Sequence, residues 1–300
     1  MNASVAHDLS QVRADVTQAT LYVVATPIGN LSDISARAIE ILSAAGANGV
    51  IAAEDTRVTR RLLDHYGITA RLISVHEHNE QRAAGQVLEL LAGGSNVALV
   101  SDAGTPGISD PGARLVAQAH AAGYRVCPVP GANAAAAAVC ASGFLSPHFL
   151  FYGFLPARAS TRRAALGTLA SLPYTLVFYE APHRVAECVD DLTAVMGADR
   201  RILFARELTK LFEETHVCAL GDAPAWFAAS AHRTKGEFVL VVECAPARAP
   251  DAAALEKTLA ALLEALPLKQ AVALAVKITG AARNDLYQRA LVLRGEGVKE

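Results

Sequence analysis

The chain has 300 residues, a formal net charge of −2, and 52% hydrophobic residues. This length allows about two domains with a large buried core, and the near-neutral charge excludes a protein that coats nucleic acid by charge alone. No apolar run reaches the roughly 18 residues that cross a bilayer, so we expect no contact with membranes. Residues 1–19 lack the features of a signal peptide, which predicts a flexible tail on a cytoplasmic protein.

Residues 20–131 alternate short apolar strands with helical stretches, which predicts a first α/β domain with a mainly parallel sheet. In the first helix, apolar residues recur at helical spacing, and Gly46 and Gly49 are expected to close it. Each strand is followed by a polar or glycine-containing segment, and such segments share one edge of a parallel sheet, where ligands bind. The expected strands are 21–25, 49–53, 71–75, 97–100 and 125–129.

The segment 97–107 (VALVSDAGTPG) joins a buried strand to a tight loop that carries one acid and two glycines. Asp110 and Pro111 follow, and we expect them to be the N-cap and the first residue of a helix. Free backbone N–H groups at such a junction bind small ligands, whereas the alternative is an ordinary turn between strand and helix. The loop alone does not decide between the two.

Residues 132–245 carry more closely spaced strands, which predicts a second α/β domain with a mixed sheet. The expected strands are 149–154, 175–179, 202–205, 216–220 and 238–244. Residues 246–300 are interpreted as a linker and a C-terminal helical region, with helices at 252–266 and 269–279. Gly280 is expected to end the second of these, and Asn284 or Asp285 to cap a last helix. The C-terminal helices together either contact RNA, in the manner of a helix-turn-helix, or serve as a packing cap.

The five cysteines are widely spaced and form no Cys-x-x-Cys pair, which predicts reduced, buried small hydrophobes rather than disulfides. They are Cys127, Cys140, Cys188, Cys218 and Cys244.

Nine strings, in this order, resemble the tetrapyrrole methylase superfamily and, within it, the bacterial enzymes that methylate a ribose 2'-hydroxyl of 16S ribosomal RNA. Together they are far more specific than one glycine-rich loop, and the resemblance spans residues 20–295. The strings are 21–31 (LYVVATPIGNL), 53–57 (AEDTR), 76–80 (HEHNE), 100–106 (VSDAGTP), 153–156 (GFLP), 178–180 (FYE), 205–210 (ARELTK), 235–237 (KGE) and 267–271 (PLKQA).

The resemblance implies two α/β domains of tetrapyrrole methylase type with a cofactor cleft between them, plus a small C-terminal helical extension. It implies S-adenosylmethionine as a bent cofactor, a homodimer, and a decoding-centre cytidine of 16S rRNA in the small ribosomal subunit as substrate. Two alternatives stay open: a methylase acting on a tetrapyrrole or other small molecule, and a non-catalytic RNA-binding assembly factor. A metal-dependent hydrolase is a distant further possibility.

The resemblance also implies which residues bind the cofactor. Pro27 and Gly29 would form the floor, and the loop 101–106 would face the methionine part. The chain has Ala132-Asn133 where related sequences have proline and a small residue, so Asn133 either adds a hydrogen bond or narrows the pocket. The complete expected set is Pro27, Gly29, Ser101, Asp102, Gly104, Thr105, Gly131, Asn133, Ala134 and, on the adenine side, Tyr179.

Methyl transfer to a ribose hydroxyl needs a positioned donor and a group that takes the hydroxyl proton. Glu54, Asp55 and Lys210 are the catalytic candidates, with His76 and Glu207 also expected on the rim. For the two acids, helix capping and a local ion pair are the alternative.

Polar side chains near the strand ends are expected to contact the substrate, although a solvated helix face is an equally common role for such charges. His76, His78 and Glu80 lack a distant ligand to complete a metal site, so we expect no metal. The expected substrate-binding set is Asn30, Arg57, His76, Asn79, Arg158 and Arg206, and Arg162 and Arg163 form a cluster with Arg158.

Overall fold

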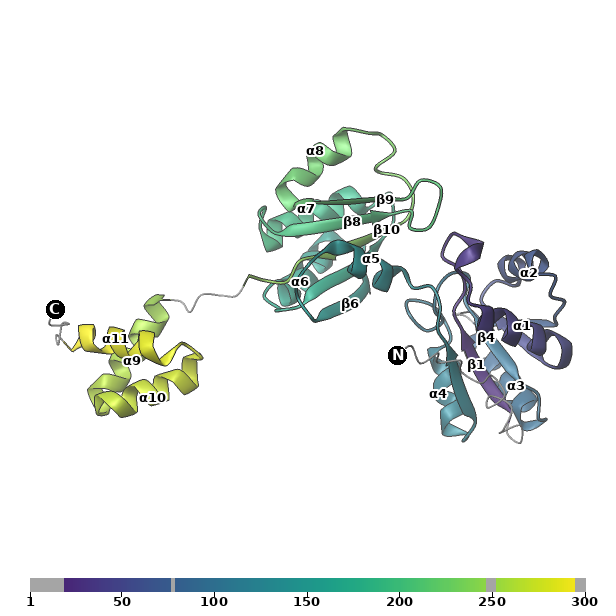
Figure 1. Cartoon of the computed structure of the whole chain (residues 1–300), viewed down its shortest axis with the longest axis horizontal. Coiled ribbons are helices and arrows are strands. Elements are labelled where there is room, and N and C mark those ends of the chain that lie inside the picture. Colours follow the sequence, from purple (N-terminus) through teal and green to yellow (C-terminus); the bar gives the residue numbers. More distant parts are fainter. Residues whose placement is uncertain (1–18, 77–78, 247–251, 295–300) are drawn as a thin grey trace, which may run out of the picture. The chain divides into compact units, whose positions relative to one another are not determined.

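The computed structural model describes residues 19–76, 79–246 and 252–294 (Figure 1). The described residues up to Cys244 form one compact unit, and those after it form a second. The first unit contains two five-stranded sheets, and the second contains helices. The predicted division at residues 131–132 stays a prediction. The predicted tail also stays a prediction, since residues 1–18 lie outside the described residues.

The prediction of a mainly parallel first sheet is confirmed: all its strand pairs are parallel, with strand order β3-β2-β4-β1-β5. Helices α1 and α2 pack against one face, and α3 and α4 pack against the other, so the buried strands are apolar on both sides. The bounds are β1 (Thr20–Val24), α1 (Ala36–Asn48), β2 (Val50–Ala53), α2 (Thr56–His65), β3 (Leu72–Ser74), α3 (Glu80–Ala92), β4 (Val97–Val100), α4 (Ala113–Ala121) and β5 (Arg125–Val129), with a short 3-10 helix η2 (Leu31–Asp33).

The start of α4 differs from the prediction. Helix α4 begins at Ala113, and its N-cap is Gly112 rather than Asp110. The φ of Gly112 is 123°, a value that favours glycine. Glu80 of α3 takes the capping role, because its Oε1 accepts hydrogen bonds from the backbone N–H groups of Gly112 and Arg114, each at 3.0 Å. A carboxylate from a neighbouring helix thus satisfies the N–H groups that Asp110 was expected to serve.

In α1, Gly49 is the C-cap as expected, whereas Gly46 lies inside the helix rather than closing it.

The second sheet is mixed, as predicted, with strand order β6-β7-β10-β8-β9 and one parallel pair, β6 with β7. Helices α6, α7 and α8 cover one face, and α5 covers the other. The bounds are α5 (Ala134–Ser142), β6 (Phe149–Phe154), α6 (Ala159–Leu169), β7 (Thr175–Glu180), α7 (Val185–Met196), β8 (Arg201–Arg206), β9 (Glu214–Ala219), η3 (Leu220–Asp222), α8 (Ala223–Ala228) and β10 (Phe238–Val242).

Arg162 and Arg163, expected as part of a surface cluster, both bind Asp191. The Arg162 side chain is buried, and its Nε donates to Asp191 Oδ2 at 2.6 Å. Arg163 donates to the other oxygen of the same carboxylate. Arg162 therefore joins α6 to α7 and is excluded from an RNA-binding surface.

The C-terminal unit is a bundle of three helices with its own apolar core, α9 (Ala252–Ala265), α10 (Leu268–Thr279) and α11 (Arg283–Leu293) (Figure 1). Gly280, with a φ of 67°, ends α10 as predicted. The N-cap of α11 is Ala282, so the expected capping by Asn284 or Asp285 is wrong. Most of the predicted linker lies outside the described residues.

No helix among the described residues is long and apolar enough to cross a membrane. All five cysteines are free. The prediction of burial is confirmed for Cys188 and is wrong for Cys140, which is exposed at the end of α5 with its Sγ against Ala137 O; the other three are half-buried.

Candidate functional site

The loop after β4 is tied to the loop after β1 by backbone hydrogen bonds. The N–H of Thr26 donates to Gly104 O at 2.8 Å, and the N–H of Gly104 donates to Thr26 O at 3.1 Å. Gly104 has a φ of 82°, which requires glycine at this turn. Within the described part of the chain, the N–H groups of Ala103 and Thr105 have no hydrogen-bond partner. The loop therefore presents two free donors at the carboxyl edge of the sheet.

Three acids at this edge are connected through the backbone. The N–H of Asp102 donates to Glu54 Oε2 at 3.2 Å, and the N–H of Asp55 donates to Asp102 Oδ1 at 2.9 Å. Burial raises the pKa values of Glu54 and Asp102, and the neighbouring carboxylates raise them further. Of the acidic catalytic candidates, Glu54 is therefore the stronger base.

Asp55 has the structural role that the sequence left open. Its Oδ1 accepts a hydrogen bond from the backbone N–H of Arg57 at 2.8 Å, which makes it the N-cap of α2. The guanidinium of Arg57 also binds this carboxylate and lowers the pKa of Asp55 to about 2. A carboxylate of so low a pKa is a weak proton acceptor, so the structure does not support the catalytic role expected for Asp55.

A polar pocket of about 560 Å³ lies on the α3 and α4 side of these acids. Asp110 lines it, and burial together with the charges of Glu54 and Asp102 raises the pKa of Asp110 to about 6. Sequence reasoning missed Asp110 as a site residue because Asp-Pro-Gly is also typical of a helix start. The pocket is lined by Glu54, His76, Glu80, Ser109, Asp110, Pro111 and Arg114.

Asn30 and Asn79 bind their own turns. Asn30 Oδ1 accepts from the N–H of Ser32 at 3.1 Å, and Asn79 Oδ1 accepts from the N–H of His76 at 2.8 Å. Their contact with substrate stays a prediction, as does that of His76 and Arg57. His78 lies outside the described residues.

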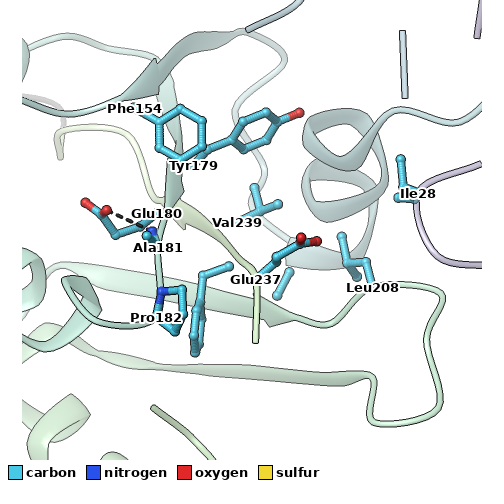
Figure 2. Close-up of a pocket in the computed structure, with 11 residues that line it drawn as sticks. Ile28, Phe154, Tyr179, Glu180, Ala181, Pro182, Leu208, Glu237 and Val239 are labelled. Atoms are coloured by element: carbon cyan, nitrogen blue, oxygen red, sulfur yellow. Dashed lines mark hydrogen bonds between the residues drawn. The ribbon is translucent and has the colours of Figure 1, made fainter. Parts of the chain in front are cut away.

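A mainly apolar pocket of about 250 Å³ lies on the second sheet, with Ile28 from the loop after β1 at its side (Figure 2). Tyr179 and Phe154 form an aromatic pair in its wall, with ring centroids 5.7 Å apart. Glu237 brings a carboxylate to the wall. An adenosine group needs such a surface, flat and apolar with a few polar groups, and Tyr179 was expected on the adenine side. The remaining lining residues are Glu180, Ala181, Pro182, Ala205, Leu208, Phe238 and Val239.

Lys210 is held as a cation near this pocket. Its Nζ lies 2.9 Å from Glu207 Oε1 and 2.8 Å from Glu237 Oε2. Burial alone lowers its pKa, but these two carboxylates outweigh burial and raise the pKa of Lys210 above its ordinary value. A catalytic base has to be unprotonated, so the expected role of Lys210 as a proton acceptor disagrees with the structure.

Gly29 lies directly against the Lys210 side chain. A Cβ atom on Gly29 would collide with Lys210 Cγ and would lie 2.9 Å from Thr209 Oγ1. Glu207 and Thr209 have positive φ values of 51° and 67°, which are strained for residues other than glycine. Gly29 and the strained turn 207–210 therefore form one tightly packed contact.

Arg206 is nine-tenths buried, and its guanidinium donates hydrogen bonds to backbone carbonyl groups. Nε donates to Lys235 O at 2.7 Å and Nη1 to Phe212 O at 3.0 Å. This placement contradicts the expected contact between Arg206 and RNA, whereas Arg158, at the start of α6, is exposed.

The chain segment that joins the two sheets carries the remaining expected cofactor residues. Asn133 is the N-cap of α5, because its Oδ1 accepts from the N–H of Ala136 at 3.0 Å. Thr105 Oγ1 donates to Ala132 O at 3.2 Å. A Cβ atom on Gly131 would lie 2.9 Å from Ala25 Cβ, so glycine allows this close approach, and Ala134 packs beneath the second sheet.

No group of three or more His, Cys, Asp or Glu side chains within the described ranges is arranged to hold a metal ion.

A parallel sheet with ligand loops at its carboxyl edge, joined to a mixed sheet with an aromatic-walled pocket, defines a two-sheet α/β enzyme that binds a small organic cofactor. Residues 20–224 match the family described as tetrapyrrole (corrin/porphyrin) methylases, and residues 249–294 match the RsmI C-terminal HTH domain. The chain belongs to the tetrapyrrole methylase family and, within it, to the ribosomal RNA small subunit methyltransferase I group.

Relatives that carry the name ribosomal RNA small subunit methyltransferase I align over nearly the whole chain. The protein of Escherichia coli O157:H7 is 49% identical over 94% of this chain and 98% of its own length. That of Pseudomonas aeruginosa is 48% identical over 92% of this chain and 98% of its own length.

Solved structures share the fold at low sequence identity. The methyltransferase CobJ has a TM-score of 0.57 at 22% identity, covering 77% of this chain and 96% of CobJ. The uroporphyrin-III C-methyltransferase of Thermus thermophilus in complex with S-adenosylhomocysteine has a TM-score of 0.50 at 17% identity, covering 75% of this chain and 97% of that one.

Proposed function

We propose that this chain methylates the ribose 2'-hydroxyl of a decoding-centre cytidine in 16S rRNA of the small ribosomal subunit, with S-adenosylmethionine as the methyl donor. The near full-length similarity to ribosomal RNA small subunit methyltransferase I proteins supports RNA methylation. The resemblance of the motifs supports the ribose hydroxyl, the cytoplasm as location, and a homodimer as the active form.

The observation that carries the proposal is the pairing of an aromatic-walled pocket with a loop that has free backbone donors. The pocket beside Tyr179 suits an adenosine group, and the N–H groups of Ala103 and Thr105 suit the carboxylate of a methionine group. These residues fit S-adenosylmethionine, which supplies an electrophilic methyl group when bound. The chain's own part is to hold that group and the ribose hydroxyl in line.

Glu54 is proposed as the proton acceptor for the ribose hydroxyl. In the transfer, a bond forms between the ribose oxygen and the methyl carbon, the carbon–sulfur bond breaks, and the hydroxyl proton moves to Glu54. Burial raises the pKa of Glu54, which strengthens it as a base. Its Oε2 is held by the N–H of Asp102, so the carboxylate has a fixed position beside the donor loop.

Exposed cations are proposed to bind the RNA backbone. A net charge of −2 leaves binding to local cations and to the shape of a folded RNA. Arg57, with its side chain 87% exposed, and Arg158 serve this role, and the C-terminal bundle adds to the RNA-binding surface.

The test is methyl transfer from radiolabelled S-adenosylmethionine to small ribosomal subunits that lack the modification. We expect label at the ribose of a single decoding-centre cytidine. Label in a porphyrinoid but not in RNA would favour a small-molecule methylase, and tight subunit binding without transfer at saturating cofactor would favour an assembly factor.

A further inference from the structure

A second cavity, of about 200 Å³, lies at the carboxyl edge of the first sheet on the α1 and α2 side. It is separate from the aromatic-walled pocket and from the polar pocket that Asp110 lines. Since a water molecule occupies about 30 Å³ of liquid, the cavity has room for a small ring rather than for one or two waters. It is lined by Thr26, Pro27, Leu31, Val58, Thr59, Arg61, Leu62, Ser101 and Asp102.

We propose that this cavity, the α2 pocket, holds an unpaired base of the substrate RNA, with a neighbouring phosphate bound by Arg61. The inference rests on the proposed function and names a binding site for the same substrate. Proteins that read RNA in this way take up a splayed-out base between side chains and hydrogen-bond its edge. Four features of the pocket fit such an occupant.

The first feature is its apolar rim. Leu31 is 40% exposed and Val58 is 38% exposed, on two different segments that line the same cavity. Leu62 forms a buried part of the wall. Apolar side chains from two segments around one cavity suit the apolar faces of a planar ring.

The second feature is a buried hydroxyl without a partner. Thr59 lines the cavity and is only 3% exposed, and its Oγ1 has no hydrogen-bond partner within the described chain. An unsatisfied buried hydroxyl costs free energy, which a ligand with polar edge atoms would recover. Threonine in a helix populates two χ1 rotamers, so the hydroxyl can turn to a base in the cavity.

The third feature is the charge at the mouth. Arg61 is exposed, and among the described residues no hydrogen bond or ion pair involves its guanidinium. By contrast, Arg57 on the same helix binds Asp55, and Arg60 donates to Ala70 O. A free guanidinium beside an apolar cavity matches a nucleotide, which is a planar base next to a phosphate.

The fourth feature is position. Asp102 and Pro27 line the α2 pocket, while the neighbouring residues Ala103 and Ile28 belong to the donor loop and to the aromatic-walled pocket. A base held in the α2 pocket would therefore bring the adjoining RNA backbone to the edge of the sheet where the donor is proposed to bind.

The experiment compares three single variants on small subunits that lack the modification. Arg61→Gln removes the free cation, Thr59→Val removes the hydroxyl at constant shape, and Arg60→Gln is the matched control on the same helix. KM for the subunits and kcat are measured at several salt concentrations, and the Kd of S-adenosylmethionine is measured by calorimetry.

For Arg61→Gln we expect KM to rise about tenfold at low salt, and the slope of log KM against log salt to fall by roughly 0.7 to 0.9, as for one lost phosphate contact. Thr59→Val should raise KM several-fold without changing the salt slope. Arg60→Gln should leave KM within about twofold, and all three should keep the cofactor Kd of the wild type.

The proposal is overturned if Arg61→Gln matches Arg60→Gln in both KM and salt slope while the wild type methylates the subunits. It is equally overturned if Arg61→Gln raises the Kd of S-adenosylmethionine and leaves KM for the subunits unchanged, because the cavity would then be part of the cofactor site. If Thr59→Val does not fold, the comparison of Arg61→Gln with Arg60→Gln still tests the proposal, because both side chains are exposed. Failure of the wild type to methylate RNA would contradict the proposed function itself.

Discussion

Neighbouring carboxylates at the edge of the first sheet differ in basicity because each has different surroundings. The carboxylate of Asp55 is fixed by a guanidinium and a helix N-terminus, which lower its pKa to about 2. Glu54, the preceding residue, is more deeply buried beside Asp102 and has a raised pKa. From the sequence alone, Glu54 and Asp55 are equal candidates for the catalytic base, since only their surroundings in the folded chain distinguish a helix cap from a base.

Replacing Glu54 with Gln should lower kcat by about 10² or more, because the variant loses the proton acceptor but keeps an oxygen for the N–H of Asp102. Asp55→Asn is the matched control, since asparagine caps a helix about as well as aspartate, and its kcat should stay within a few-fold. Single-turnover methylation measures the rate of transfer in each variant, and calorimetry measures its affinity for the cofactor. A Glu54 variant with wild-type kcat would remove this residue from the mechanism.

Asp110 should make stability depend on pH in the range from about 4 to 6. Its pKa is raised from 3.8 to about 6 in the folded chain, mainly by burial, so the folded state binds the proton more tightly than the unfolded state. The protein loses this stability as pH rises through 6. At pH 8, Asp110→Asn should therefore be more stable than the wild type, by at most about 3 kcal/mol and by less after solvent screening.

The measurement is urea unfolding of both proteins between pH 4.5 and pH 8. The difference between them should shrink toward the acid end, where the wild-type carboxyl is protonated too. A difference that does not vary with pH would show that Asp110 ionises in the fold as it does in the unfolded chain.

At the scale of elements, the sequence predicts strands better than caps and ion pairs. The bounds of β4, β5 and β6 match the prediction, because a run of apolar residues between polar or glycine segments is a local signal. The cap of α4 could not be predicted in the same way, because Glu80 comes from another helix. The protonated state of Lys210 depends likewise on Glu237, which only the folded sheet brings near.

Part of the candidate site could likewise be predicted from the sequence, and part of it could not. The rule that ligand loops follow parallel strands places Asp102 and Glu54 together, and they are hydrogen-bonded in the structure. The α2 pocket was missed because Thr59 and Arg61 have the spacing of ordinary helix residues. Only the packing of α2 beside the loop after β1 turns that helix into the wall of a cavity.

The cap that Glu80 provides for α4 should contribute measurably to stability. Glu80→Ala leaves the N–H groups of Gly112 and Arg114 without an acceptor, which should destabilise the protein by about 1–3 kcal/mol. Glu80→Gln keeps an oxygen in place and should lose less. Thermal unfolding of both variants is the measurement, and equal Tm values for Ala and wild type would contradict a capping role.

At the scale of the whole molecule, the loop after β1 in the first sheet meets the turn after β8 in the second sheet at Gly29 and Lys210. Ile28 from the same loop lines the aromatic-walled pocket, as does Leu208 from the same turn. The shape of the proposed donor site thus depends on how closely these two segments approach. Glycine at position 29 allows that approach, and the bridge from Lys210 to Glu207 and Glu237 holds the turn.

Gly29→Ala should weaken S-adenosylmethionine binding about tenfold, because the added Cβ has to displace Lys210 or shift the loop. Lys210→Ala alone should also weaken binding, through loss of the bridge to the two carboxylates. In the double variant the steric conflict with Lys210 Cγ is gone, so the two losses of affinity should not add. The double variant should still bind the cofactor more weakly than the wild type, because Thr209 and Leu208 also crowd position 29.

Calorimetry on the wild type, the two single variants and the double variant measures the coupling between the two residues. Gly85→Ala, at an open position of α3, is the control that should leave the Kd unchanged. Strictly additive effects would show that the two residues act on the donor site independently.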